Sequence, residues 1–120
     1  EPALMGVVAG IAVAAVALIH LYILVLEMFL WERPAGRRAF GTSPEFAAAT
    51  RVLAANQGLY NGFLAAGLIW GLWTGNVAVQ RFFLGCVLVA GFYGALTANA
   101  RILWVQASPA ALALVLLAFA

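Results

Sequence analysis

The strongly apolar, uncharged segment from Leu4 to Leu26 limits the possible folds more than any other feature of the chain. A helix over this range is about 34 Å long at a rise of 1.5 Å per residue, whereas the hydrocarbon core of a bilayer is about 30 Å thick. Apolar residues continue past Glu27 to Trp31. The pattern therefore predicts a helix over about residues 4–31 that crosses a membrane with some tilt. Because the opening "EPALMGVVAG" lacks the basic region of a secretory signal, we expect this helix to be retained.

Composition extends this prediction to the whole chain. Of the 120 residues, 67% are hydrophobic and 8% are charged, against about a quarter charged in soluble domains. The chain therefore has too little polar surface to fold as a globule in water, and a bilayer is the solvent that suits it. The basic residues are all arginine, and a net charge of +2 does not indicate a nucleic-acid partner. The single cysteine, Cys86, rules out an intramolecular disulfide.

A second helix is expected over about residues 44–74. The segment "ERPAGRRAFGTSPEF" interrupts the first apolar run with arginine, proline and glycine. Inside it, Ser43 precedes Pro44 and Glu45, which is the order of an N-cap, a first-turn proline and an acidic residue at the start of a helix. The turn "TGNVAVQR" follows, so a third helix is predicted over about 79–104.

The fourth helix, over about residues 107–120, is the shortest. Ser108 and Pro109 repeat the order of a cap and a proline. From Pro109 to Ala120 a helix would be only about 18 Å long, which is too short to cross a bilayer. Two alternatives follow: the helix begins near Ile102 and bends at Pro109, or the C-terminus stops within a locally thinned bilayer.

The arginines predict the orientation of these helices. Four of them surround the first connection and Arg101 lies at the third, whereas the second connection has only Arg81. The positive-inside rule then places the first and third connections in the cytoplasm, and the tryptophans fall at matching boundaries. We therefore expect an all-α polytopic membrane protein, a compact four-transmembrane-helix bundle forming a single domain over residues 1–120 in the cell inner (plasma) membrane.

Polar residues within the first three helices fall on one face of each helix. His20 and Glu27 lie seven residues apart on one stripe. On the second helix, Asn56 with Tyr60 and Gln57 with Asn61 form two i, i+4 pairs that share one face. Because an unsatisfied polar atom in lipid costs several kcal/mol, we expect these faces to meet in a polar cleft that opens to the cytoplasm. The predicted cleft residues are His20, Glu27, Asn56, Gln57, Tyr60, Asn61, Tyr93, Thr97, Arg101 and Gln106.

Structural alternatives exist for these residues. The amides could join helices by hydrogen bonds, and Glu27 with Arg101 could form an ion pair without further function. One histidine and one intramembrane carboxylate do not supply the three or four ligands of a stable metal site. We therefore expect neither a metal nor another cofactor.

Three functions fit this pattern. The first is binding of a small amphipathic or lipid-like ligand in the cleft, extending to transport. The alternatives are a membrane enzyme that uses His20 and Glu27 as acid and base on a lipid, and a structural subunit of a larger membrane assembly. Since the enzyme is only one of these alternatives, we assign no catalytic residues. The expected partners are membrane lipid and the amphipathic ligand, and proton-coupled export would also require a homodimer.

Four segments carry a resemblance to a known family: "HLYILVLEMFLW" from His20, "NQGLYNGFLAAGL" from Asn56, "AGFYGALT" from Ala90 and "QASPAALAL" from Gln106. In these the chain resembles the domain of unknown function 1304 family, which consists of small integral membrane proteins. The resemblance implies a four-helix membrane protein and assigns no catalytic residues. The segments contain most of the predicted cleft residues, but Arg101 lies outside them.

Overall fold

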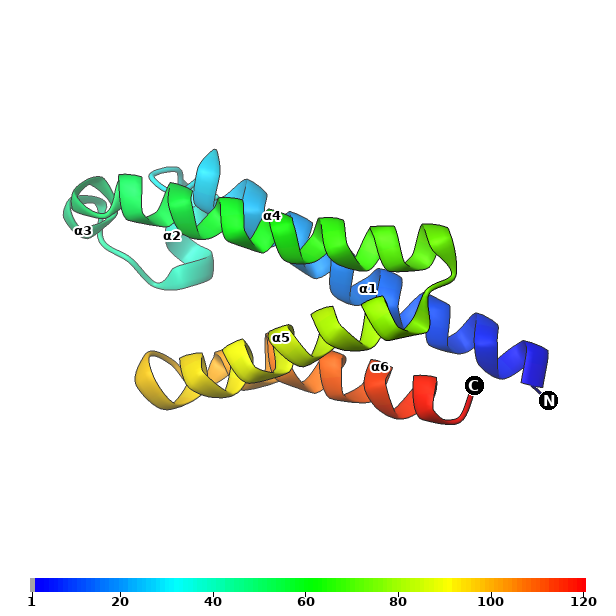
Figure 1. Cartoon of the computed structure of the whole chain (residues 1–120). Helices are drawn as coiled ribbons and strands as arrows, with labels where there is room; N and C mark the ends of the chain where they lie inside the picture. The colour runs from blue at the N-terminus through cyan, green and yellow to red at the C-terminus, as the bar shows by residue number, and fades with distance from the viewer. Residues whose placement is uncertain (1) are drawn as a thin grey trace. The chain divides into compact units, whose positions relative to one another are not determined.

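A computed structural model describes residues 2–120, and these residues form helices joined by short connections, with no strand among them. The prediction of an all-α chain is confirmed. The elements in chain order are α1 (Pro2–Met28), α2 (Pro34–Phe40), α3 (Pro44–Ala49), α4 (Arg51–Thr74), α5 (Val77–Thr97), the π-helical turn η1 (Leu103–Ala107) and α6 (Ser108–Ala118) (Figure 1).

Two helices are long and apolar enough to cross a membrane: α1 over Ala3–Met28, and α5 over Val77–Thr97. The apolar helix Leu103–Ala118 is shorter. Helix α4 has sufficient length, but its amide side chains make it less apolar. The described residues thus indicate association with a membrane through two helices.

The first two predicted helices are shorter in the structure than the sequence patterns suggest. Helix α1 ends at Met28, where the expected range continued to residue 31. Arg33 has an extended backbone (φ −80°, ψ 160°), as expected for a residue before proline. Thr50 divides the expected 44–74 helix into α3 and α4, because its φ of −108° and ψ of 9° depart from helical values.

The last two helices also differ from the expected ranges. Helix α5 ends at Thr97, and Asn99 then accepts a hydrogen bond at Oδ1 from the amide of Arg101, a local bond that competes with helix continuation. Ser108 is not an N-cap. Its backbone N–H bonds to the Leu103 carbonyl and its hydroxyl donates to the same oxygen at 3.1 Å, within a helical segment that runs through the π-helical turn. Pro109 accounts for this wider turn, since its ring would clash with the carbonyl four residues earlier in a regular α-helix.

The chain forms two compact units, and we describe each by itself. The first contains residues 2–19 and 64–120. Its core consists of apolar side chains from α1, α4, α5 and α6, among them Val13, Leu68, Leu84 and Ala113, none of which is exposed to solvent. Gly91 lets α5 pack against η1, since a Cβ at Gly91 would lie 2.8 Å from that of Ala107.

The second unit contains residues 20–63, which include the end of α1, the two short helices α2 and α3, and the start of α4. Glycines allow close packing here too. A Cβ added at Gly58 would lie 2.6 Å from Met28 Cγ, and one at Gly62 would lie 2.7 Å from Leu24 Cδ1. The rings of Trp31 and Phe40 pack with centroids 5.0 Å apart.

Candidate functional site

A buried hydrogen bond joins the carboxylate of Glu27 to the amide of Asn61. Asn61 Nδ2 donates to Glu27 Oε1 at 2.7 Å and to the Gln57 carbonyl of its own helix at 3.2 Å. Glu27 is 7% exposed and Asn61 is 8% exposed. Within residues 2–120 Asn61 is the hydrogen-bond donor that reaches this carboxylate. Since a carboxylate has about four lone-pair positions, most of its accepting capacity remains unused.

Small residues on α4 bring the two helices close enough for this contact. Gly58 and Gly62 are four residues apart and flank Asn61 on the face of α4 that packs on α1. A Cβ at Gly58 would lie 3.1 Å from Glu27 Cβ and 3.3 Å from the Leu24 carbonyl oxygen. The glycine spacing therefore allows the Asn61 amide to reach across to Glu27, as small residues do in membrane helix pairs.

His20 is buried, with 1% of its surface exposed. It precedes Glu27 by two helical turns on α1, a rise of about 10 Å. The imidazole and the carboxylate therefore do not contact each other. A direct His20–Glu27 proton relay has no geometric basis, although both side chains leave the same helix near one face.

The other predicted residues of α4 are exposed. Asn56 donates its amide to the Val52 carbonyl of its own helix at 3.1 Å, and Gln57 is exposed as well. Tyr60 is 65% exposed and packs edge-on against Phe63. These side chains lie outside the Glu27–Asn61 contact.

The predicted residues of the first unit are also near the surface. Tyr93 is 70% exposed, and Thr97 donates its hydroxyl to the Tyr93 carbonyl at 2.7 Å. Arg101 is exposed and Gln106 is half-buried. A polar cleft that unites all the predicted residues remains a prediction.

Two open surface cavities lie among the described residues, and neither is lined by Glu27 or Asn61. One, of about 700 Å³, is an open groove along α5 lined by Arg81, Phe82, Gly85, Cys86, Val89, Ala90 and Tyr93. The other, of about 270 Å³, lies on α2 and the residues after it and is lined by Pro34, Arg37, Arg38, Gly41 and Thr42. The sequence patterns predicted that the α2 arginines set the orientation and contact anionic lipid, but not that they line a cavity. Their spacing beside Gly41 is the feature that could have indicated a site.

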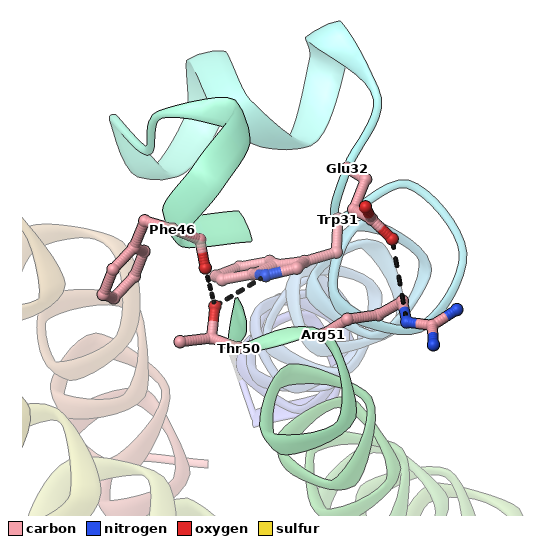
Figure 2. A network of polar contacts seen from close by, with 5 residues as sticks. All are labelled: Trp31, Glu32, Phe46, Thr50 and Arg51. Carbon is pink, nitrogen blue, oxygen red and sulfur yellow. Dashed lines mark hydrogen bonds and ion pairs between the residues drawn. The ribbon is translucent and has the colours of Figure 1, made fainter. Parts of the chain in front are cut away.

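The sequence patterns did not predict a network of polar contacts at the first connection (Figure 2). Trp31 Nε1 donates to Thr50 Oγ1 at 3.1 Å, and that hydroxyl donates to the Phe46 carbonyl at 2.7 Å. Glu32 and Arg51 approach at 3.7 Å on the surface, a distance and exposure at which an ion pair contributes little. The tryptophan and threonine thus connect the residues after α1 to the start of α4.

The described residues contain no group of three or more His, Cys, Asp or Glu side chains that could hold a metal ion.

Comparison with known proteins gives a family without an assigned activity. The model of a family described as "Protein of unknown function (DUF1304)" matches residues 14–118. A relative from Lactococcus lactis subsp. lactis (strain IL1403), the uncharacterized protein YpaA, is 33% identical over 104 residues, which cover 83% of this chain and 87% of the relative. No solved structure matches the chain.

Proposed function

We propose that this chain, which belongs to the DUF1304 family of proteins of unknown function, is a multi-pass membrane protein that binds a small amphipathic ligand at Glu27. The ligand donates hydrogen bonds or carries a positive charge. The observation that carries this proposal is the buried carboxylate of Glu27, which accepts a single 2.7 Å hydrogen bond, from Asn61, among the described residues.

Burying the Glu27 carboxylate in its ionised form costs free energy, because the charge loses its contact with water. A charged side chain at the centre of a membrane helix costs about 2.5–3.5 kcal/mol on insertion scales, and ionisable residues in membrane helices mark sites for ions, protons or ligands. Glu27 lies one residue before the end of α1, so the cost of its charge is smaller than this and comes mainly from its burial against α4. One neutral amide does not offset the desolvation of an ionised carboxylate. A cationic or hydrogen-bond-donating ligand would supply the further donors, while its apolar part would lie among the surrounding apolar side chains.

The proposal includes four membrane-spanning segments: α1, α4, α5, and the segment from η1 through α6. Helix α4 is long enough at 24 residues. The continuous helical segment from Leu103 to Ala118 supports the alternative in which the last span begins before Pro109. In this arrangement the first and third connections are cytoplasmic, because the arginines are concentrated there.

Cysteine labelling tests this topology. The natural cysteine is first removed as Cys86→Ser, and single cysteines are then introduced as Ser43→Cys, Asn76→Cys and Asn99→Cys in the three connections. In intact cells, a membrane-impermeant maleimide should label position 76 alone, and all three should react after the membrane is opened. Labelling of 43 and 76 from the same side would contradict the four-span arrangement.

Ligand binding is tested by what the purified protein retains. The natural chain, Glu27→Gln and Glu45→Gln are each purified in mild detergent. The compounds that co-purify with each protein are then extracted and identified by mass spectrometry. The Glu27→Gln variant keeps an oxygen that can accept from Asn61 but removes the carboxylate, whereas Glu45 is an exposed acid on α3 and serves as the matched control. A compound enriched with the natural chain and Glu45→Gln, but lost from Glu27→Gln, is expected. Identical extracts from all three proteins would refute the proposal.

A second candidate, a structural role, is favoured by the close packing at Gly58. In that case the hydrogen bond between Glu27 and Asn61 serves to hold α1 against α4. The two candidates differ in the Asn61→Leu variant. A structural bond predicts lower stability with no change in the extract, whereas a binding site predicts a changed extract as well.

A further inference from the structure

We propose that the cavity on α2 binds the phosphate of an anionic lipid headgroup, with Arg37 and Arg38 as its main ligands. The cavity has a volume of about 270 Å³, which is below the range of about 300–1,000 Å³ found for drug-sized ligands. It suits a compact anion whose chain or acyl part extends outside. The arginine fork matches the oxygens of a phosphate in distance and direction.

The guanidinium of Arg37 is already oriented by its own connection. Its Nε donates to the Glu32 carbonyl at 3.3 Å, which leaves the two terminal amino groups for a ligand. Arg37 is half-buried, so it loses less side-chain entropy on binding than an arginine extended into solvent. Arg38 is exposed at the mouth of the same cavity.

The backbone around the cavity is held in place by two glycines. Gly36 is buried, and a Cβ there would collide with the carbonyl oxygen and carbon of Leu30, so glycine lets α2 rest directly on the chain after α1. Gly41 has a φ of +67°, which glycine adopts without strain. Its amide and that of Thr42 both donate to the Arg37 carbonyl. These two hydrogen bonds satisfy the Arg37 carbonyl oxygen at the end of α2. It therefore does not compete with a bound anion for the hydrogen-bond donors of the arginines.

The polar lining and the local charge also favour an anion. Thr42 lines the cavity, and its Oγ1 is buried without a hydrogen-bond partner among the described residues. Burying a hydroxyl without a partner is unfavourable, and rotation about the Thr42 Cα–Cβ bond would let this hydroxyl donate to a phosphate oxygen in the cavity. Residues 32–51 carry four arginines and two glutamates, and Glu32 is directed to Arg51, outside the cavity. The cavity itself contains no acidic side chain among its described lining residues.

The aromatic residues around the connection favour a lipid as the source of the phosphate. Trp31 packs on Phe40 and donates its indole N–H to Thr50, while Phe46 is 55% exposed. Tryptophan with exposed aromatic side chains is typical of the headgroup level of a membrane. Arginines beside such residues on the cytoplasmic side attract anionic lipid, and here two of them line a cavity.

Native mass spectrometry of the detergent-purified chain tests the proposal, with phosphatidic acid and phosphatidylcholine as the added lipids. We expect the natural chain to bind phosphatidic acid in preference to phosphatidylcholine. The double variant Arg37→Gln/Arg38→Gln should lose roughly tenfold in affinity for phosphatidic acid. The double variant Arg33→Gln/Arg51→Gln removes the same charge from the same connection without touching the cavity lining, and should lose much less.

Three results would overturn the proposal. Equal losses in the two double variants would mean that net charge alone attracts the lipid. Equal binding of both lipids by the natural chain would mean that no phosphate site discriminates between them. Complete displacement of phosphatidic acid by inorganic phosphate at equal concentration would make the free anion the ligand. If the circular dichroism of Arg37→Gln/Arg38→Gln shows that this variant is misfolded, Arg37→Lys is measured in its place, since lysine keeps the charge but lacks the guanidinium fork. We expect Arg37→Lys to bind phosphatidic acid clearly more weakly than the natural chain, and an unchanged affinity would count against the site.

Discussion

The packing of α5 against the π-helical turn η1 predicts that Gly91→Ala destabilises the protein. A Cβ at Gly91 would lie 2.8 Å from the Ala107 Cβ, 2.9 Å from its backbone nitrogen and 3.1 Å from its Cα. Two of these atoms are backbone, in a turn whose hydrogen bonds are set by Ser108 and Pro109. They cannot move aside as the end of a flexible side chain does, so the helices must separate.

The size of the effect follows from a comparison within one helix. Gly85 is also on α5, and a Cβ there would meet no atom of the described residues within 4 Å. Both alanine variants gain the same helix propensity, up to about 1 kcal/mol, so this contribution cancels between them. The difference is the cost of overpacking, about 1–3 kcal/mol. We therefore expect Gly91→Ala to be less stable than Gly85→Ala by that amount.

The assay is reversible unfolding in mild detergent by titration with sodium dodecyl sulfate, followed by far-ultraviolet circular dichroism. The natural chain, Gly91→Ala and Gly85→Ala are measured side by side. Gly85→Ala should match or exceed the natural chain in its unfolding midpoint, and Gly91→Ala should unfold at a lower detergent fraction. Equal midpoints for the two variants would show that Gly91 is not at a close contact, and would refute the packing of α5 on η1.

Three further predictions use the same unfolding assay. Asn61→Leu and Glu27→Leu, each of which removes one partner of the hydrogen bond, should show a coupling energy of about 0.6–1.7 kcal/mol when measured singly and together; additive effects would mean that the bond contributes nothing. Trp31→Phe keeps most of the aromatic packing but loses the hydrogen bond to Thr50, and should cost about 1 kcal/mol, with no loss if Thr50→Ala is already present. Asn76→Ala removes the side-chain oxygen that accepts the amide of residue 79 at 3.2 Å, and should cost about 0.5–2 kcal/mol; substitution by serine should restore most of that stability, and a serine variant as unstable as the alanine variant would argue against a capping role.

The sequence determined the helical class and, to within two residues, the starts of α3 and α5, because these depend on local chemistry. The long apolar runs require backbone hydrogen bonds to be satisfied within each segment, which a helix provides. Ser43 caps α3 at 3.1 Å as its place before Pro44 and Glu45 predicts. The helix ends were less predictable. Thr50 and Ala98 interrupt helical runs through backbone angles that no residue pattern marks.

The candidate site depended more on tertiary structure. The face of α4 that carries amides was visible from spacing alone, but spacing did not distinguish Asn61, which is buried against Glu27, from Asn56, which bonds to its own helix. That difference arises from the side on which Gly58 and Gly62 allow close approach. The α2 cavity likewise exists only because Gly36 and Gly41 fold the connection back on itself. Helical periodicity fixes the direction of each side chain around its own axis, whereas the pairing of side chains depends on how closely two backbones can pack.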